Sequence, residues 1–599
     1  MSLLHSLDRY YSRMAARGEA EELGFTRENI GFCLTFDRSG ALRDVIDLRT
    51  LSGRRLVPRR MSVPRPKRTS NIQGNFLWDK TAYAFGIDGG KSKRLVQEHR
   101  SFLAFQHQML AGLTGPHVEG FLAFIDAWVP EHFRSPPFTA EMVDASFVFR
   151  LEGEQQYLHE VPALRERWMA SLQDAEATQI LCLVTGQTGP LESGHPIIKN
   201  VEGAQTAGAY LVSFNATAFT SYDKPCDGSN APVSKDAAAR YGAALNGLLE
   251  RGSPNRLPRP IGDATVVFWA DAAEERAAQA AENWFAEFFN PSVIEGEAAN
   301  PDGDAPQTKK LRDALQMLSE GRPVRDLDPT LEEGVRFHIL GLSPNAARIS
   351  VRFWLTDSFE VFAKRLARHY ADLSIQPLPW RANPPAVNWL LMKTTALQQK
   401  FENIPFLLAG EVTRAILSGT PYPRSLLAAA LIRLRAGDDP ASGWHAAAIR
   451  AVLARLNDKK EPPPVSLNRE EPNAAYQLGR MFAMAEIAQR MALGKVNATI
   501  RDRYFGAASA TPASVFPLLL RGMQNHLSKL RKGGKGGFIE REMDQIAEQL
   551  PPGLPRSLRL EEQGRFVIGY YHQRRARVAG KPVDELVEEQ TAGEAETNE

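Results

Sequence analysis

The stretch "NIGFCLTFDRSGALRDVIDL", residues 29–48, decides how the first part of the chain folds. Its apolar side chains recur at alternate positions, which is the spacing of one face of a β-strand: Ile30, Phe32, Leu34 and Phe36. The pair Ser39-Gly40 interrupts this pattern with residues typical of a turn, and "ALRDVIDL" resumes it. We therefore predict a two-stranded hairpin with its turn at Ser39-Gly40.

Strand patterns continue along the first two thirds of the chain and then stop. Apolar runs predict strands at residues 146–152, 179–186, 209–215, 264–271 and 347–355. Helical patterns lie among them at residues 272–289 and 358–373, and an amphipathic helix is expected near residues 1–18. Farther on, the spacing is helical at 389–403, 424–436, 443–457, 473–492, 513–531 and 537–549. The predicted fold class is α+β, with a mixed α/β N-terminal two thirds and an all-α helical bundle in the C-terminal region.

Length and linkers predict several domains, because 599 residues are too many for one hydrophobic core. Two proline-rich stretches, "IQPLPWRANPPAVN" (375–388) and "KKEPPPVSLNREEP" (459–472), are typical of breaks between domains. We predict two α/β regions, a helical connector, a C-terminal helical bundle and a disordered acidic tail. Their expected bounds are 1–255, 256–380, 381–460, 473–580 and 581–599.

Composition excludes some classes of protein. The formal net charge is only +2, from 72 Lys and Arg against 70 Asp and Glu, so overall charge indicates no partner. The three cysteines are scattered and form no CxxC pair, which fits a reducing cytoplasm. The N-terminal segment lacks the apolar core of a signal peptide, and no apolar run approaches the ~20 residues that span a bilayer. We expect a cytoplasmic protein without a membrane partner.

Catalytic patterns are weak. The stretch "GIDGGKS" (86–92) is one residue short of the spacing of a phosphate-binding loop, so we interpret it as a glycine turn. His99 and His107 lie eight residues apart on a predicted helix, with no carboxylate at metal-ligand spacing. No nucleophile elbow and no paired carboxylates of a two-metal nuclease stand out. We therefore predict a protein that is not an enzyme and that uses no catalytic residue, metal or cofactor.

Residues 48–78, which we call the basic segment, contain eight cations and no Asp or Glu. The cations are Arg49, Arg54, Arg55, Arg59, Arg60, Arg65, Lys67 and Arg68. Because proline removes ladder donors, Pro58, Pro64 and Pro66 favour a long ordered loop over a strand.

Three amides, Asn71, Gln73 and Asn75, follow the cations at alternate positions. Lys and Arg supply phosphate contacts, whereas Asn and Gln can read base edges in a groove. The pattern favours a loop that reads duplex DNA, with a loop that grips another protein or structured RNA as the alternative. The candidate phosphate contacts are Arg59, Arg60, Arg65, Lys67 and Arg68, and the candidate base readers or wedge residues are Asn71, Gln73 and Asn75.

A second cationic stretch lies in the helical region. Residues 495–538 hold eight Lys or Arg and one acid, Asp502, and "KLRKGGKGG" ends a predicted helix in a basic loop. The functional interpretation is contact with the backbone of a single strand, and the alternative is a helix cap with solubilising lysines. The candidate single-strand contacts are Arg521, Lys529, Arg531, Lys532 and Lys535.

Several motifs together resemble the large subunit of the type I-C CRISPR Cascade surveillance complex. They include "CLTFDRSGALRDVIDLR" (33–49), "NIQGNFLWDKTAYAFG" (71–86), "VEGAQTAGAYLVSFNATAF" (201–219) and "NAPVSKDAAARYGAALNGLL" (230–249). They continue with "ILGLSPNAARISVRFW" (339–354), "AAYQLGRMFA" (474–483) and "EEQGRFVIGYYHQRRA" (561–576). The motifs extend from near the N-terminus to about residue 576. After the basic segment this chain departs from the family pattern, with Asn71 in place of a glycine and Lys80 in place of an asparagine.

The resemblance implies a non-catalytic subunit for antiviral defence. Its implied partners are the CRISPR RNA, double-stranded target DNA, the backbone and small subunits, and a helicase–nuclease recruited after R-loop formation. It implies recognition of the protospacer-adjacent motif (PAM), while guide pairing reads the target. It also implies that the C-terminal region corresponds to the small subunit, made separately from an internal start for which Met481 is the candidate. Two other functions stay open: a nuclease or NTPase of a defence system, and an RNA-binding scaffold without PAM reading.

Overall fold

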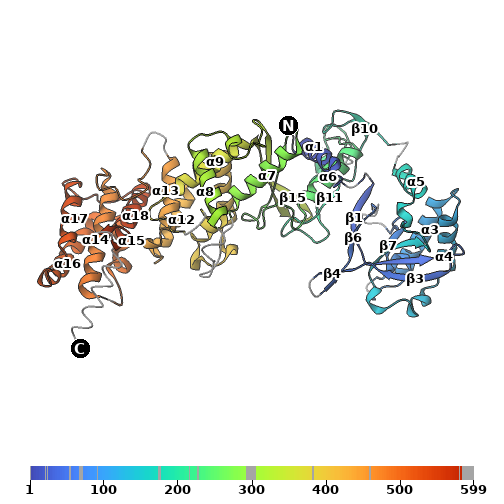
Figure 1. The fold of residues 1–599 in the computed structure, drawn as a ribbon, viewed down its shortest axis with the longest axis horizontal. Helices are drawn as coiled ribbons and strands as arrows, with labels where there is room; N and C mark the ends of the chain where they lie inside the picture. Colours follow the sequence, from blue (N-terminus) through green and yellow to red (C-terminus); the bar gives the residue numbers. More distant parts are fainter. Residues whose placement is uncertain are drawn as a thin grey trace. The chain divides into compact units, whose positions relative to one another are not determined.

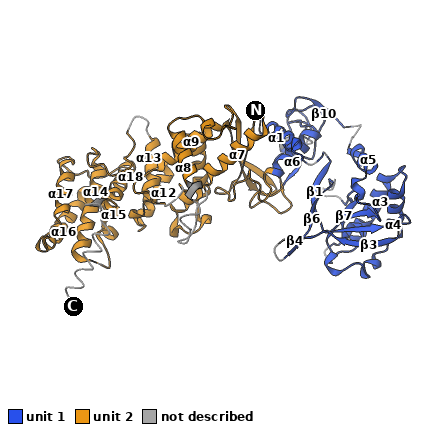
Figure 2. Cartoon of the chain, viewed as in Figure 1, with its two compact units in different colours: residues 1–198, 210–247 blue, residues 199–209, 248–599 orange. Residues whose placement is uncertain are grey.

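In the computed structural model the chain forms two compact units (Figure 1, Figure 2). The first contains residues 1–198 and 210–247, and the second contains residues 199–209 and 248–599. The residues that the structure describes are 2–20, 22, 24–52, 55–65, 72–90, 92–172, 177–214, 216–225, 228–291, 305–380, 384–456, 461–494, 496–578 and 581–582. The predicted fold class is confirmed, since mixed sheets fill the N-terminal part and helices the C-terminal part.

The first unit alternates short strands with helices. Its strands are β1 (Phe25–Ile30), β2 (Phe32–Phe36), β3 (Leu42–Asp47), β4 (Thr50–Ser52), β5 (Arg55–Val57), β6 (Arg59–Pro64), β7 (Trp78–Lys80), β8 (Ser146–Leu151), β9 (Gln179–Leu181) and β10 (Thr188–Pro190). Its helices are α1 (Leu3–Ala16), α2 (Thr81–Ala84), α3 (Leu95–Leu110), α4 (Pro116–Ala127), α5 (Pro162–Leu172) and α6 (Lys235–Leu248). Near the unit boundary in the sequence lie β11 (Ile197–Ile198) and β12 (Ala209–Tyr210), so the strand expected over 209–215 is much shorter.

The predicted hairpin is confirmed as β2 and β3, and Gly40 in its turn has φ +84°. These strands belong to a four-stranded sheet of order β3-β2-β8-β7, in which β2 and β8 run parallel. Phe32, Leu34 and Phe36 face a core shared with α3, α4 and α5. The prediction was wrong about Ile30: it ends the separate strand β1 and packs in a smaller cluster with Cys33. Because β2 is covered on both faces, simple alternation could not separate these two clusters.

The prediction that the basic segment is a loop was wrong over much of its length. Thr50–Ser52 and Arg55–Val57 pair antiparallel as the β4–β5 hairpin, and β6 pairs antiparallel with β1 from Arg59 to Pro64 (Figure 1). Pro58 lies between β5 and β6, and Pro64 is the last residue of β6, opposite Phe25. Prolines at strand ends remove few ladder donors, so they are compatible with this two-stranded ribbon.

The second unit begins with three antiparallel strands and then becomes helical. The strands are β13 (Thr265–Asp271), β14 (Arg336–Asn345) and β15 (Arg348–Ser358), with β14 between the other two. The patterns predicted β13 and β15 but not β14. The helices near them are α7 (Glu275–Phe289), α8 (Ala305–Ser319) and α9 (Phe359–Leu373). Ser358 ends β15 and caps α9, because its hydroxyl accepts a hydrogen bond from the Val361 amide at 3.3 Å.

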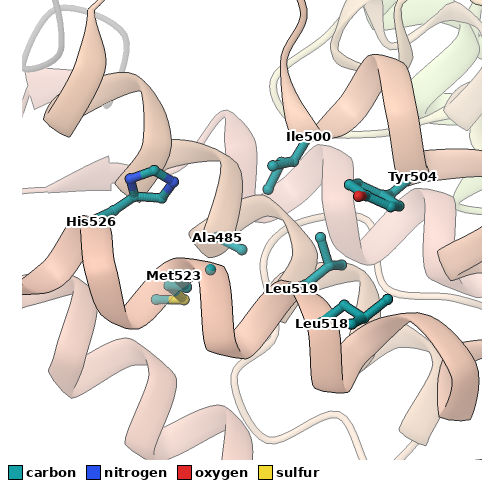
Figure 3. A pocket seen from close by; sticks show the side chains of 8 residues that line it. Ala485, Ile500, Tyr504, Leu518, Leu519, Met523 and His526 are labelled. Atoms are coloured by element: carbon teal, nitrogen blue, oxygen red, sulfur yellow. The ribbon is translucent and has the colours of Figure 1, made fainter.

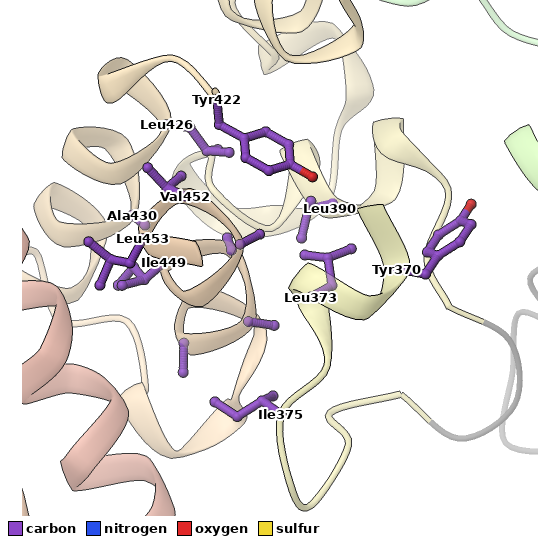
Figure 4. Packing of buried hydrophobic residues seen from close by; sticks show 14 of the residues in the cluster. Tyr370, Leu373, Ile375, Leu390, Tyr422, Leu426, Ala430, Ile449, Val452 and Leu453 are labelled. Carbon is purple, nitrogen blue, oxygen red and sulfur yellow. The ribbon is translucent and has the colours of Figure 1, made fainter. Parts of the chain in front are cut away.

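Helices dominate the rest of the second unit. They are α10 (Val387–Met392), α11 (Phe406–Ser418), α12 (Arg424–Arg435), α13 (Trp444–Leu456), α14 (Ala474–Leu493), α15 (Ile500–Ala510), α16 (Pro512–Lys532), α17 (Gly537–Glu548) and α18 (Leu560–Arg574). Only the two-residue strands β16 (Arg577–Val578) and β17 (Lys581–Pro582) depart from the all-helical expectation among the described residues there. Side chains of α9, α10, α12 and α13 meet in one apolar core, as Figure 4 shows. That core continues to Tyr571 of α18.

Helices α14 and α18 make the closest helix contact of this region at two glycines. A methyl group on Gly479 would lie 2.0 Å from the Phe566 carbonyl oxygen, and one on Gly569 would lie 2.0 Å from the Tyr476 carbonyl oxygen. Arg480, which is fully buried, donates hydrogen bonds to Gln573 at 2.8 Å and to Glu542 at 3.0 Å. The contact therefore combines close backbone packing with a buried polar network. The finer domain bounds predicted from the sequence stay predictions.

Candidate nucleic-acid interface

The ribbon of β1 and β6 presents a polar face that carries two arginines. In an antiparallel pair, residues directly opposite each other point to the same side, and alternate residues share a face. Arg60 lies opposite Asn29, and Ser62 lies opposite Arg27. All four residues are exposed, whereas Met61 and Val63, on the other face, are buried with Trp78. Tertiary pairing thus brings Arg27 and Asn29, which sequence reasoning missed, beside the predicted Arg60.

Arg59 begins β6 and is also exposed. Because Arg59 lies opposite Ile30 and alternates with Met61, it belongs to the other face of the ribbon. We call Arg27, Asn29, Arg60 and Ser62 the ribbon face. A pairing of Arg27 with β6 could not be read from spacing, because the two strands are about thirty residues apart along the chain and no local pattern links them.

The hairpin of β4 and β5 presents apolar side chains beside an exposed arginine. Leu51 lies opposite Leu56, and these side chains are 74% and 51% exposed. Arg55 next to them is exposed as well. At the base of the hairpin, Arg49 donates to Asp47 at 2.7 Å and to Glu141 at 3.0 Å, and its guanidinium lies 4.7 Å from the centre of the Phe32 ring. Arg49 is therefore engaged in structural contacts, and its hydrogen bonds lower the pKa of Asp47.

Arg65 differs from its neighbours because it is half-buried. Burial lowers the pKa of its guanidinium, while the nearby Glu192 and Tyr241 act in the opposite direction. Its amide donates to the Gly24 carbonyl at 2.8 Å, which continues the pairing of β6 beyond Pro64. This environment favours an anchoring role for Arg65. The predicted contacts of Lys67, Arg68 and Asn71 lie outside the described residues.

Residues 72–78, which we call the return limb, are held tightly against α3. Gln73 is half-buried, and Asn75 is only 2% exposed. The Asn75 amide donates to the Asp79 carboxylate at 2.9 Å, and the Asn75 carbonyl accepts from Gln106 at 2.7 Å. The burial argues against direct base contact by Asn75 in this conformation and fits a structural role. Gln73 and Asn71 stay predicted base readers.

The second cationic stretch lies mainly on α16, whose two faces differ. Its apolar face, which includes Phe516, Met523 and Leu527, is buried in the core of the second unit. Arg521, Lys529, Arg531 and Lys532 are exposed on the other side, and Lys535 in the following turn is half-buried.

Two of these five predicted cations have local partners. Lys529 donates to the carbonyl of Ala492, and Arg531 pairs with Glu540. We find no hydrogen bond or ion pair from the side chains of Arg521, Lys532 or Lys535 to another described residue. These three are the stronger candidates for an external anion.

A small hollow lies between α14, α15 and α16 (Figure 3). Its volume is about 140 Å³, and its lining is mostly apolar, with Ile500, Leu518 and Met523 beside Tyr504 and His526. Partial burial lowers the pKa of His526, which favours the neutral imidazole. The lining offers no cation for a phosphate and no carboxylate for a metal.

The glycine turn predicted at residues 86–92 is confirmed for its described residues. Gly86 and Gly90 have φ of +69° and +80°. The Asp88 carboxylate accepts from the Gly90 amide at 3.1 Å and from the Ser92 amide at 2.6 Å. Amides that a phosphate would need are therefore already bound to a carboxylate, which would also repel a phosphate.

Other chemistry is equally limited in the described part of the chain. No three His, Cys, Asp or Glu side chains there gather as a metal site would need. His99 Nδ1 donates a hydrogen bond to the Tyr83 carbonyl at 2.8 Å, and His107 Nε2 lies 2.7 Å from the Asp126 carboxylate. Among the described helices, none is long and apolar enough to cross a membrane. The predicted internal start Met481 is 5% exposed within α14.

Comparison with known families shows to which class this protein belongs. Residues 7–578 match a family model described as a CRISPR-associated protein, so the chain has a CRISPR-associated role in defence. The family is Cas_Csd1, and because the match spans nearly the whole chain, the chain belongs to it. No curated protein sequence matches the chain.

Proposed function

We infer that this chain is the large subunit of a type I-C CRISPR RNA-guided surveillance complex and that it recognises the PAM in duplex target DNA. Membership of the Cas_Csd1 family supports the defence role. The observation that carries the DNA-binding part is the ribbon face, where Arg27 and Arg60 share one side of two paired strands, with the exposed Arg59 at the start of β6. Cations on a twisted ribbon can follow a phosphate backbone, and the neighbouring amides supply donors and acceptors for base edges.

The exposed leucines of the β4–β5 hairpin fit the same function. An apolar pair beside arginines can insert between base steps and unstack them, as other minor-groove binders do. Leu51 and Leu56 would thereby assist unwinding and R-loop formation, while the CRISPR RNA reads the sequence. Arg49 would keep the hairpin aligned with the four-stranded sheet, because its ion pairs join the hairpin to Asp47 and Glu141.

In the second unit, Arg521, Lys532 and Lys535 would contact the backbone of the displaced strand. The C-terminal helices would fill the place of a small subunit and could also be made separately from Met481. A product that starts there lacks Arg480 and Gly479, which join α14 to α18. Its stability would then depend on neighbouring subunits. The helicase–nuclease supplies the cleavage, and this chain is proposed to be non-enzymatic.

The test uses the complete complex, assembled with its CRISPR RNA and backbone subunits. Duplexes would carry a guide-matched target beside randomised base pairs, and bound duplexes would be sequenced. The proposal expects enrichment of specific bases beside the target. Equal binding of all flanking sequences would favour the RNA-binding scaffold, and metal-dependent nicking of plasmid by the purified chain would favour the nuclease.

A further inference from the structure

The two ends of the segment between β6 and β7 lie side by side. The Trp78 indole donates a hydrogen bond to the Pro64 carbonyl at 2.8 Å, so the end of β6 and the start of β7 are joined. Trp78 is buried together with Val63 and Met61 from β6. The end of β6 and the start of β7 are therefore fixed at the same place in the first unit.

Helix α3 holds the return limb through two polar side chains. The Ser101 hydroxyl accepts from the Gly74 amide at 3.3 Å and donates to the Ile72 carbonyl at 3.3 Å. The Gln106 side chain donates to the Asn75 carbonyl at 2.7 Å and accepts from the Leu77 amide at 3.1 Å. Each side chain thus binds the limb with both a donor and an acceptor. Gln73 lies between Ile72 and Gly74, the two residues that Ser101 holds, and its side chain is half-buried.

The limb also fits α3 sterically. A methyl group on Gly74 would lie 2.5 Å from the Phe102 Cα atom, so only glycine permits this approach. Phe76 stacks on Trp168 with ring centroids 5.7 Å apart, and Leu77 adopts φ +58°, which is rare for a leucine. Because Gln106 is fully buried, losing its amide would leave two buried backbone groups of the limb without partners.

We propose that Ser101 and Gln106 are positioning residues of the candidate nucleic-acid interface. They fix the return limb, and with it Gln73, relative to the strand that carries Arg59 and Arg60. This inference rests on the proposed function. Holding a recognition segment in place before binding reduces the ordering cost of binding and aligns its amide groups with base edges. The cations of the ribbon face set how tightly DNA is held, and the α3 contacts set how well one flanking sequence is distinguished from another.

The decisive variant is Gln106→Met, which keeps the length of the side chain and removes both hydrogen bonds. In complete complexes we expect the preference for the enriched flanking sequence over a scrambled one to fall by about tenfold. The slope of log affinity against log salt should stay unchanged, since no phosphate contact is lost. Gln108→Met is the matched control, because Gln108 is exposed on the same helix. It should leave both quantities unchanged.

A second pair of variants keeps the proposal testable if Gln106→Met does not fold. Ser101→Ala should lower the preference, and Ser101→Thr, which retains the hydroxyl, should restore it. Limited trypsin digestion supplies a readout without DNA: cleavage after Lys80, at the end of β7, should accelerate several-fold in Ser101→Ala and not in Ser101→Thr. Accelerated cleavage of the limb with unaltered sequence preference would show a merely structural role and overturn the inference.

The failures of the two proposals are distinguishable. If wild-type complexes show no preference among flanking sequences, the proposed function fails. If wild-type complexes show a preference that Gln106→Met and Ser101→Ala retain in full, only the inference about α3 fails.

Discussion

The two cationic regions of this protein are built on opposite principles. On the ribbon of β1 and β6, Arg60 comes from an acid-free segment and Arg27 from a distant strand, and the two share one exposed face. On α16 the cations occur on a single amphipathic helix, where Arg531 pairs with Glu540 and Lys529 binds the Ala492 carbonyl. A similar number of charges in the sequence is therefore arranged in two different ways.

The contrast shows that the number of cations in a sequence segment is only an upper limit on the number that can contact an anion. In the basic segment, Arg49 forms ion pairs with Asp47 and Glu141, and Arg65 is half-buried near Glu192. The ribbon differs in that strand pairing brings a further cation, Arg27 of β1, to the same face as Arg60.

The largest expected effect tests the ribbon. Replacing Arg27, Arg59 and Arg60 together by Gln should lower the affinity of complete complexes for target DNA by roughly a hundredfold at moderate salt. Each lost phosphate contact should also reduce the log–log salt slope by about 0.9. Filter binding at several salt concentrations measures both quantities. A chain carrying Arg49→Gln is the control, and a ribbon variant with an unaltered slope would assign the ribbon to a protein or RNA contact.

The second prediction concerns the packing that holds the helical region together. Gly479→Ala should lower the free energy of unfolding by about 1–3 kcal/mol, because the added methyl meets the Phe566 carbonyl. Gly522→Ala on α16 is the matched helix control. It has open space around it and should gain up to ~1 kcal/mol from higher helix propensity. Urea denaturation followed by circular dichroism compares them, and equal stability of the two variants would contradict the close contact of α14 and α18.

The third prediction compares the two units by their response to acid. Burial lowers the pKa of His159 in the first unit and of His445 and His572 in the second to about 4. Below pH ~6.5 the unfolded imidazoles bind protons that the folded ones do not, so stability should fall as the pH falls from 6.5 to 4. Each histidine should contribute on the order of 2 kcal/mol between pH 7 and pH 5.

Thermal unfolding at a series of pH values checks this dependence. His159→Gln should flatten the pH dependence of unfolding of the first unit, and His572→Gln that of the second. Since His572 also contacts the Tyr476 hydroxyl at 2.9 Å, its replacement should lower stability at pH 7 while still reducing the slope. A slope that neither variant changes would show that these imidazoles titrate normally.

The smallest effect is expected on α16. Replacing Arg521, Lys532 and Lys535 by Gln should leave initial duplex binding almost unchanged and weaken retention of the displaced strand by about threefold. Permanganate footprinting of the displaced strand after R-loop formation measures this. Lys529→Gln with Arg531→Gln is the control, because both side chains already have partners. A larger loss in the control than in the test variant would reverse the assignment.

Part of the fold could be predicted from local patterns. The hairpin of β2 and β3, the strands β8, β13 and β15, and the helices α9, α12, α13, α14, α16 and α17 follow directly from apolar periodicity. The prolines of the basic segment do not exclude strands, because the effect of a proline depends on whether the strand has a partner at that position. The strand β14 was missed because a strand buried on both sides shows no alternation.

The sequence by itself determined the succession of an α/β region and a helical region, the acid-free basic segment, and the motifs that mark the family. These features depend on residues close together along the chain, where periodicity and charge can be recognised directly. Only the tertiary structure decided which charges are exposed together and which amides are buried. Strand pairing brings Arg27 to the same face as Arg60. Arg65 is half-buried near Glu192, and the backbone of the buried Asn75 is hydrogen-bonded to Asp79 and Gln106. Exposure and pairing arise from contacts between distant segments, and no local pattern specifies them.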